Sequence, residues 1–206
     1  YYWDVLRLFQ EIKNGLAQAA TAYGSRLVSA GVDTWGVDYG WIDSQGQLLG
    51  LPRAYRDPRT AGLCEEAHRR LSARELYEAT GIQFMPFNTL YQVLSEVVAG
   101  ASGPTVADRL LFMPDLFHYW LTGRAINERT IASTSQMLDT RTGNWSGNVL
   151  ESMGIPVQPF GEIVEPGTLL GRLTDGVAAE TGAGALSIVA PGSHDTASAV
   201  AGTPAG

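Results

Sequence analysis

Apolar runs of strand length alternate with segments of helical period along this chain, and this alternation constrains the fold more than any other feature. Apolar residues recur at helical spacing from Val5 to Ala20, which predicts an amphipathic helix near the start. Because strands are interleaved with helices, we expect an α/β fold and not an all-α or all-β one. The predicted strands lie near residues 27–32, 37–42 and 186–190.

Helix and turn signals place further elements between these runs. Asp4 is a candidate N-cap of the first helix and Gly24 its candidate end. Residues 43–46 have turn chemistry, so residues 47–50 are expected to return as the second arm of a hairpin. Residues 127–135 are predicted to be a polar loop. The other expected helices are 58–80 (broken near Ser72 and closed by Gly81), 89–98, 115–121 (with Pro114 in its first turn and Gly123 at its end) and a small-residue helix running through Val200.

Length and charge bound the class of protein. The 206 residues suffice for one large domain with its own core. A net charge of -7 argues against nucleic acid or an anionic membrane as a partner. Cys64 is the only cysteine, which favours a reducing cytoplasm. Since the chain starts within a helical pattern and without an initiating Met, we expect it to be an excerpt of a longer protein.

The segment from Ser193 to Thr196 is the first candidate site. It follows a strand and a Pro-Gly turn and opens a helix, and open α/β sheets bind ligands at the carboxyl ends of their strands. The Asp195 carboxylate could accept a proton from a substrate hydroxyl there. Alternatively, Ser193 or Asp195 caps the helix, and His194 is a hydrogen-bonded core histidine.

Two carboxylates, Asp33 and Asp38, suggest a glycosidase as another interpretation. Five residues apart on one strand, however, they would point to opposite faces. If this segment is extended, Thr34, Gly36 and Asp38 share a face, and Gly36 leaves room for a ligand against bare backbone.

Three further segments mix aromatic, basic and amide side chains. Trp35 could form the apolar wall of a sugar site or belong to the core. Arg56 could orient hydroxyls, whereas its neighbour Asp57 fits an N-cap before Pro58. Phe87 and Asn88 suit a sugar-lining loop or a packed loop. The sequence contains no P-loop or dinucleotide fingerprint, and its three histidines are too scattered to predict zinc.

Several segments, taken together, resemble the N-terminal domain of the FGGY carbohydrate kinases. They are residues 111–123, ending in Leu121-Thr122-Gly123, then 127–139, and Gly192-Ser193-His194-Asp195-Thr196-Ala197. Residues 32–39, 54–60 and 81–92 resemble the rhamnulokinase branch of that family and differ from glycerol kinases and xylulokinases. The resemblance spans nearly the whole chain.

This resemblance implies an RNase H-like domain of the actin-like ATPase superfamily, with a mixed sheet flanked by helices. Residues 1–206 would form most of the N-terminal sugar-binding domain. The first phosphate-loop hairpin and the C-terminal nucleotide-binding domain, which would be the partner across a cleft, are absent from this sequence. ATP and Mg²⁺ would be bound mainly by those absent segments, so the chain alone is expected to be inactive.

The implied reaction moves the γ-phosphoryl group of ATP to the 1-hydroxyl of L-rhamnulose. By motif, Asp195 would be the catalytic base, and Gly36, His194 and Thr196 would contact the sugar. Trp35, Arg56, Phe87 and Asn88 would shape its pocket. Two alternatives stay open: a kinase of the same family for another ketose or polyol such as fuculose, and a non-catalytic sugar sensor.

Overall fold

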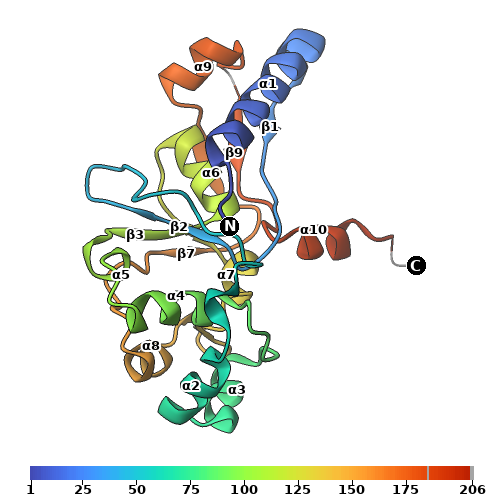
Figure 1. Ribbon diagram of the computed structural model, residues 1–206. Coiled ribbons are helices and arrows are strands. Elements are labelled where there is room, and N and C mark those ends of the chain that lie inside the picture. Colours follow the sequence, from blue (N-terminus) through green and yellow to red (C-terminus); the bar gives the residue numbers. More distant parts are fainter. Residues whose placement is uncertain (185, 205–206) are drawn as a thin grey trace.

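The computed structural model describes residues 1–184 and 186–204 and has the expected α/β architecture. Figure 1 shows α1 and α9 with β1 and β9 at one end of the molecule, α2, α3 and α8 at the other, and β2 and β3 between them. The helices are α1 (Val5–Tyr23), α2 (Leu63–Arg70), α3 (Ala73–Thr80), α4 (Thr89–Val98), α5 (Gly103–Val106), α6 (Met113–Thr122), α7 (Arg129–Ser133), α8 (Gly147–Met153), α9 (Asp175–Thr181) and α10 (Asp195–Gly202), with 3₁₀ helices η1 (Gly24–Arg26) and η2 (Pro58–Thr60).

Short strands form one mixed three-stranded sheet and several pairs. In the sheet, β1 runs parallel to β9 with Ser29 opposite Ser187, and β8 runs antiparallel on the other side of β9. The carboxyl ends of β1 and β9 therefore lie at the same edge. The strands are β1 (Ser29–Ala30), β2 (Tyr39–Ile42), β3 (Arg109–Phe112), β4 (Asn127–Glu128), β5 (Leu138–Asp139), β6 (Asn144–Trp145), β7 (Ile163–Val164), β8 (Leu169–Arg172) and β9 (Ser187–Val189), of which β2–β3 and β5–β6 pair antiparallel and β4–β7 parallel.

Local signals for helix ends are confirmed where they were strongest. The Asp4 side chain accepts the Arg7 N–H at the start of α1. Ser72 and Glu75 form a reciprocal capping box between α2 and α3, and Gly81 ends α3 with a φ of 65°. These caps satisfy backbone groups within a few residues of sequence, so they could be predicted without tertiary information.

The polar loop predicted at 127–135 is wrong in part. Asn127 and Glu128 form β4 beside β7, and residues 129–133 form α7. The segment has few apolar residues, yet its polar side chains are buried: Asn127 and Glu128 are both completely buried, and Asn127 donates to Asp115 while Glu128 accepts from Thr130. Hydrophobic periodicity therefore could not detect it.

The predicted hairpin at 37–50 is confirmed, but the sheet partner of its first arm is distant. Asp43 donates its N–H to the Gln47 carbonyl oxygen, and Ile42 pairs with Leu48 as an isolated bridge. Along its length β2 pairs with β3, with Tyr39 opposite Phe112.

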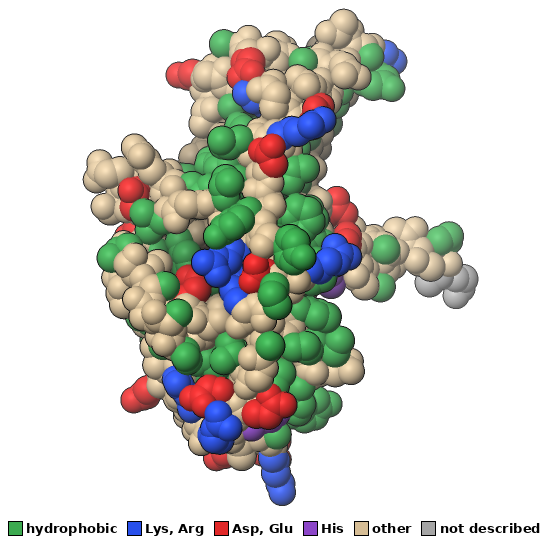
Figure 2. Space-filling view, in the orientation of Figure 1, with side chains coloured by type: hydrophobic (Ala, Val, Ile, Leu, Met, Phe, Trp, Pro, Cys, Tyr) green, Lys and Arg blue, Asp and Glu red, His purple; other side chains and the backbone are tan. Residues whose placement is uncertain are grey.

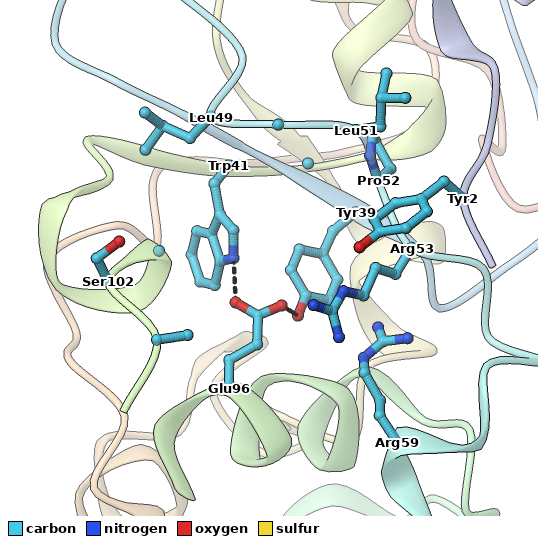
Figure 3. A pocket seen from close by; sticks show the side chains of 14 residues that line it. Tyr2, Tyr39, Trp41, Leu49, Leu51, Pro52, Arg53, Arg59, Glu96 and Ser102 are labelled. Atoms are coloured by element: carbon cyan, nitrogen blue, oxygen red, sulfur yellow. Dashed lines mark hydrogen bonds between the residues drawn. The ribbon is translucent and has the colours of Figure 1, made fainter. Parts of the chain in front are cut away.

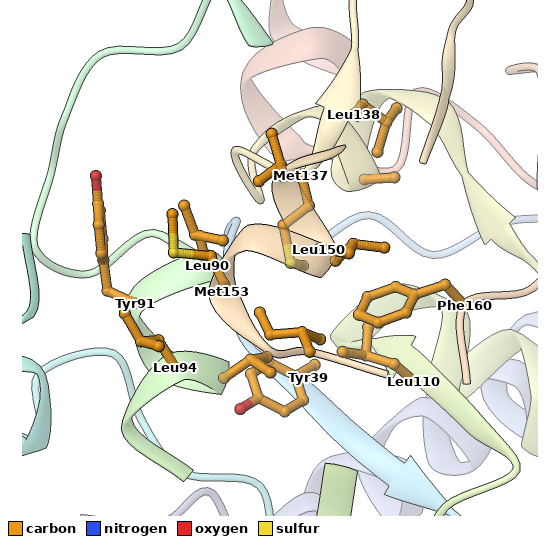
Figure 4. Packing of buried hydrophobic residues seen from close by; sticks show 14 of the residues in the cluster. Tyr39, Leu90, Tyr91, Leu94, Leu110, Met137, Leu138, Leu150, Met153 and Phe160 are labelled. Carbon is orange, nitrogen blue, oxygen red and sulfur yellow. The ribbon is translucent and has the colours of Figure 1, made fainter. Parts of the chain in front are cut away.

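The largest hydrophobic cluster lies under β2 and β3, between them and α4, α7 and α8. Figure 4 shows side chains of β2, β3, α4 and α8 meeting in it, among them Tyr39, Leu110, Leu90 and Met153. Leu90 and Leu110 are completely buried, so this cluster fixes α4 against the sheet. No described helix is both long enough and apolar enough to cross a membrane.

Candidate functional site

A cavity of about 380 Å³ opens beyond the carboxyl ends of β1 and β9. Six of the eight residues predicted for the site line it, and Thr196 and Arg56 do not. Its lining consists of Trp35, Gly36, Val37, Tyr55, Ile82, Gln83, Met85, Phe87, Asn88, Thr134, His194 and Asp195. Aromatic faces beside a few polar groups are typical of a carbohydrate site.

Parallel pairing continues from the sheet into this cavity. Thr34 donates its N–H to the Ser193 carbonyl oxygen at 3.0 Å, and its own carbonyl oxygen accepts the Asp195 N–H at 2.9 Å. The backbone that carries His194 and Asp195 is thereby held against the segment that follows β1. In this way the sheet positions a carboxylate at the mouth of the cavity.

The Asp195 side chain is not a helix cap, so that alternative is wrong. His194 occupies the N-cap position of α10 and makes no capping bond with its side chain, while the Ser193 hydroxyl donates to the Pro191 carbonyl oxygen. The Asp195 carboxylate is 56% exposed and accepts a hydrogen bond from the Thr196 hydroxyl at 3.1 Å. Figure 1 shows α10 projecting from the body. The carboxylate is therefore accessible to a ligand.

Gly36 allows a close approach between two walls of the cavity. A Cβ atom at this position would lie 3.1 Å from Thr134 Cγ2 and 3.3 Å from His194 Nε2. Those spacings are tighter than most Cβ contacts, so a larger residue would displace His194 or Thr134. The glycine thus allows two parts of the protein to approach each other, and the expectation that its bare backbone also faces a ligand stays a prediction.

Asp38 is not part of a shared face with Thr34 and Gly36, which corrects the expectation of an extended segment. The chain turns because Asp38 donates its N–H to the Gly36 carbonyl oxygen, and Val37 has a φ of 69°. A left-handed conformation is rare for a β-branched residue. The turn directs Asp38 into the interior, where its side chain is completely buried.

The buried Asp38 carboxylate joins four segments. It accepts hydrogen bonds from the Nε1 atoms of Trp3 and Trp35, at 2.6 and 3.0 Å, from Gln92 Nε2 at 3.1 Å and from the Tyr55 N–H at 3.2 Å. Burial raises the pKa of Asp38, and these hydrogen bonds oppose that shift. With Asp38 enclosed and Asp33 exposed, the two do not form a glycosidase pair flanking one cleft.

The strained turn at Val37 is held by side chains from elsewhere in the chain. Its N–H donates to the Thr134 hydroxyl at 3.1 Å. Its carbonyl oxygen accepts from the Thr89 hydroxyl at 2.7 Å and from Gln92 Nε2 at 3.2 Å. Because such backbone strain costs about 1–3 kcal/mol, these bonds are needed to keep this wall of the cavity in place.

Arg56, Phe87, Asn88 and Thr196 take different places around the cavity. The Arg56 guanidinium lies 4.6 Å from the ring centroid of Tyr55, at the rim, and Phe87 packs edge-on against the same ring. The buried Asn88 amide donates to the Gln83 carbonyl oxygen and to Gln136 Oε1, so it shapes the loop. The Thr196 hydroxyl donates to Asp195 Oδ1 at 3.1 Å and lies 3.5 Å from His194 Nε2, so it touches two residues that line the cavity.

Sequence reasoning missed Glu128, which holds the loop of His194 and Asp195. Its completely buried carboxylate accepts the Ser193 N–H at 3.0 Å, across 65 residues of sequence. The same carboxylate accepts the Thr130 hydroxyl at 2.6 Å and the Thr130 and Ile131 N–H groups that begin α7. The Thr130 hydroxyl in turn accepts the His194 N–H at 3.1 Å. Glu128 thus ties α7 to the candidate catalytic loop.

A second buried carboxyl, Asp115, supports Glu128. It accepts the Glu128 N–H and the Asn127 side-chain amide, both at 3.2 Å. Burial raises the pKa of Asp115 well above its ordinary value. Within the described residues, no group of three or more His, Cys, Asp or Glu side chains could hold a metal ion.

Comparisons with known proteins agree on one family. Residues 2–202 match the model of the FGGY family of carbohydrate kinases, N-terminal domain. The rhamnulokinase of Bacteroides thetaiotaomicron is 42% identical over 205 residues, which are 100% of this chain and 42% of that protein. The rhamnulokinase of Pectobacterium atrosepticum is 41% identical over 99% of this chain and 40% of its own length. The chain thus spans about two fifths of these relatives.

Solved structures confirm the predicted fold. A gluconate kinase from Lactobacillus acidophilus superposes with a TM-score of 0.84 at 16% identity, over 92% of this chain and 39% of that one. Plasmodium falciparum glycerol kinase with ADP gives 0.80 at 14% identity, over 93% of this chain and 40% of that one. At such low identity the likeness concerns the fold alone.

Proposed function

This chain belongs to the FGGY family of carbohydrate kinases, and we propose that its full-length parent transfers the γ-phosphoryl group of ATP to a sugar hydroxyl bound beside Asp195. The observation that carries the proposal is the exposed Asp195 carboxylate, held at the mouth of an aromatic-lined cavity and not used as a helix cap. We propose the 1-hydroxyl of L-rhamnulose as the acceptor, since whole-chain relatives at 42% and 41% identity are named rhamnulokinases.

In the proposed step the hydroxyl oxygen attacks the γ-phosphorus. A new O–P bond forms while the bond from the γ-phosphorus to the β,γ-bridging oxygen breaks, and ADP leaves. The hydroxyl proton passes to the Asp195 carboxylate, which also orients the hydroxyl for attack. Phosphoryl transfer depends mostly on positioning and charge stabilisation, so a carboxylate whose backbone is held by the sheet suits this role.

Side chains of the cavity would bind and orient the sugar. The faces of Trp35 and Phe87 offer apolar walls for the carbon skeleton, and His194, which is 27% exposed, offers a ring nitrogen to its hydroxyls. Gly36 lets the ligand approach the backbone. We propose that Arg56 and Thr196 act from the rim, through Tyr55 and Asp195 respectively.

ATP and Mg²⁺ would be held mainly by parts of the parent outside this chain, including a C-terminal domain facing the cavity. Bound Mg·ATP supplies the phosphoryl group and neutralises charge on its oxygens. We also propose that the parent acts in the cytoplasm, as the single cysteine of this sequence, Cys64, suggests.

The test measures ADP release by the full-length parent with Mg·ATP and L-rhamnulose, L-fuculose, D-xylulose or glycerol. Asp195→Asn should lower kcat by about 100- to 10,000-fold, the usual contribution of a general base. Asp175→Asn is the matched control, because Asp175 is also an exposed aspartate at the first position of a helix, α9, and does not line the cavity.

The outcomes separate the candidates. Turnover that prefers L-rhamnulose and collapses only in Asp195→Asn supports the proposal in full. A preference for another sugar keeps the kinase and corrects its substrate. Sugar binding without turnover of any sugar would favour a non-catalytic sensor, and wild-type turnover in Asp195→Asn would remove Asp195 as the base.

A further inference from the structure

A second cavity, of about 260 Å³, lies between β2, α4 and the segments at 49–53 and 101–103. It shares no lining residue with the first cavity. Figure 3 shows the side chains of Arg53, Arg59, Tyr39, Trp41 and Glu96 converging on it. On the face shown in Figure 2, basic and acidic side chains are interspersed, with several basic ones gathered near the middle.

The one carboxylate in the lining, Glu96, is already bonded to neutral donors. One of its oxygens accepts the Tyr39 hydroxyl at 2.8 Å and the other accepts Trp41 Nε1 at 2.8 Å. Burial, together with the Glu96 charge, raises the pKa of Tyr39 well above its ordinary value, so this phenol stays protonated and donates. Glu96 forms no ion pair with either arginine among the described residues, so its charge does not cancel theirs directly.

Arg59 presents donors that the protein does not fully use. Its side chain is only 10% exposed. Nη2 donates to Gln92 Oε1 at 2.5 Å and Nη1 donates to the Ala54 carbonyl oxygen at 3.4 Å, but Nε is buried without a hydrogen-bond partner among the described residues. Arg59 forms one long ion pair, with Asp57 Oδ1 3.8 Å from Nη1. A guanidinium has five N–H donors, and the bonds to Gln92 and Ala54 use one on each Nη atom, so each Nη atom has a second N–H for an acceptor in the cavity.

We propose that this cavity binds a small oxyanion, a phosphate or a carboxylate, between Arg53 and Arg59. The planar guanidinium fork matches the oxygen spacing of both groups. Arg53 is exposed, and its guanidinium lies 5.7 Å from the ring centroid of Tyr2 at the mouth of the cavity, so it can close over a ligand that Arg59 holds from inside. The aromatic edges of Tyr39 and Trp41 would pack against the body of that ligand.

Gln92 links this cavity to the first one. While its Oε1 accepts from Arg59, its Nε2 donates to the carbonyl oxygens of Phe87, at 2.9 Å, and Val37, at 3.2 Å. Both of those residues line the first cavity. An anion that shifts the Arg59 guanidinium would therefore change the bonds that hold the first cavity's wall, and the two ligands would alter each other's affinity by the same factor.

The test is calorimetric titration of the full-length parent without nucleotide, with and without L-rhamnulose. Inorganic phosphate and malonate are the probes, and KCl holds the ionic strength constant. Arg53→Gln and Arg59→Lys should each weaken binding of the preferred probe about tenfold, since each loses charge-assisted bonds. Arg26→Gln is the matched control, because Arg26 is also an exposed arginine next to a tyrosine ring and lies outside the cavity.

Each result has one meaning. Saturable binding at one site that weakens in both arginine variants but not in the control supports the proposal, and the stronger probe tells a phosphate site from a carboxylate site. No saturable binding, or binding that both variants leave unchanged, overturns it. If Arg59→Lys does not fold, the affinity of the Arg53→Gln variant for the probe decides between these two outcomes, because Arg53 is exposed. A sugar affinity that bound anion does not alter would refute the link through Gln92. These titrations measure binding and do not require turnover, so a failure of the proposed kinase activity would be seen in the ADP-release assay and not here.

Discussion

On acidification the buried His118 should destabilise the folded chain, an effect that the raised pKa values of Asp38 and Asp115 oppose. His118 lies on α6, is completely buried, and accepts the Val32 N–H at Nε2 at 3.0 Å. Burial lowers the pKa of His118 from 6.5 to about 4. In the unfolded chain the imidazole takes up a proton near its ordinary pKa, whereas in the folded chain it stays neutral until about pH 4. Between these values the unfolded state binds more protons, so stability is lost as the pH falls below 6.5.

The two pKa values fix the size of the effect. From pH 7.5 to pH 5, His118 alone should lower the free energy of unfolding by about 2 kcal/mol. The loss should reach about 3 kcal/mol once the pH is below the folded-state pKa. Because a protein of this size is stable by only about 5–15 kcal/mol, a change of this size should be measurable as a difference between the wild type and a variant in which residue 118 does not titrate.

Urea unfolding followed by tryptophan fluorescence at several pH values between 7.5 and 5 tests this. His118→Gln is the comparison, because a glutamine oxygen can still accept the Val32 N–H but does not titrate. Other groups titrate in both proteins, so the difference between them isolates His118. Equal pH dependence in the wild type and the variant would refute the reasoning. Since His118 stays neutral in the folded chain down to about pH 4, its bond to the Val32 N–H persists over this pH range, and only the unfolding equilibrium should respond.

The proposed site gives three further predictions. Glu128→Gln should lower kcat about 10- to 100-fold with little change in the sugar KM, because it weakens the bond that holds the Ser193 N–H. Steady-state kinetics test this, with the exposed Glu162→Gln as the control. An unchanged kcat in Glu128→Gln would exclude the positioning role. Gly36→Ala should raise the sugar KM about tenfold, whereas Gly15→Ala, whose added Cβ has open space, should not; equal effects in titrations of both variants would argue against close approach at Gly36. The isolated 206-residue chain should release no ADP from ATP, and measurable turnover would contradict our assignment of the nucleotide site to the rest of the parent.

The parts of the fold that could be predicted are those whose causes lie within a few residues. The helix at 89–98, the break at Ser72 and the stop at Gly81 all occur as expected. Each depends on periodicity or on a cap that satisfies nearby backbone groups. The hairpin turn at 43–46 belongs to the same class.

The turn at Val37 could not be predicted because its causes are distant. Nothing in the local sequence marks a valine for a positive φ, and propensity argues against it. The conformation is held by Thr89, Gln92 and Thr134, which lie on other elements. Tertiary contacts thus overrule local preference at the wall of a ligand cavity, which is where strained backbone is commonly found.

The roles of the carboxylates, like the turn at Val37, depend on contacts that are distant in the sequence. Sequence chemistry cannot tell an exposed carboxylate from a buried one, so Asp38 looked like a partner of Asp33 and Glu128 looked like part of a polar loop. Burial separates them. The Asp38 and Glu128 carboxylates are enclosed by hydrogen-bond donors from several segments and so join those segments. The Asp195 carboxylate is 56% exposed and is therefore accessible to a ligand. The buried pair is therefore what holds the cavity wall and the Asp195 loop in place, and a site search based on charged residues alone would rank all three equally.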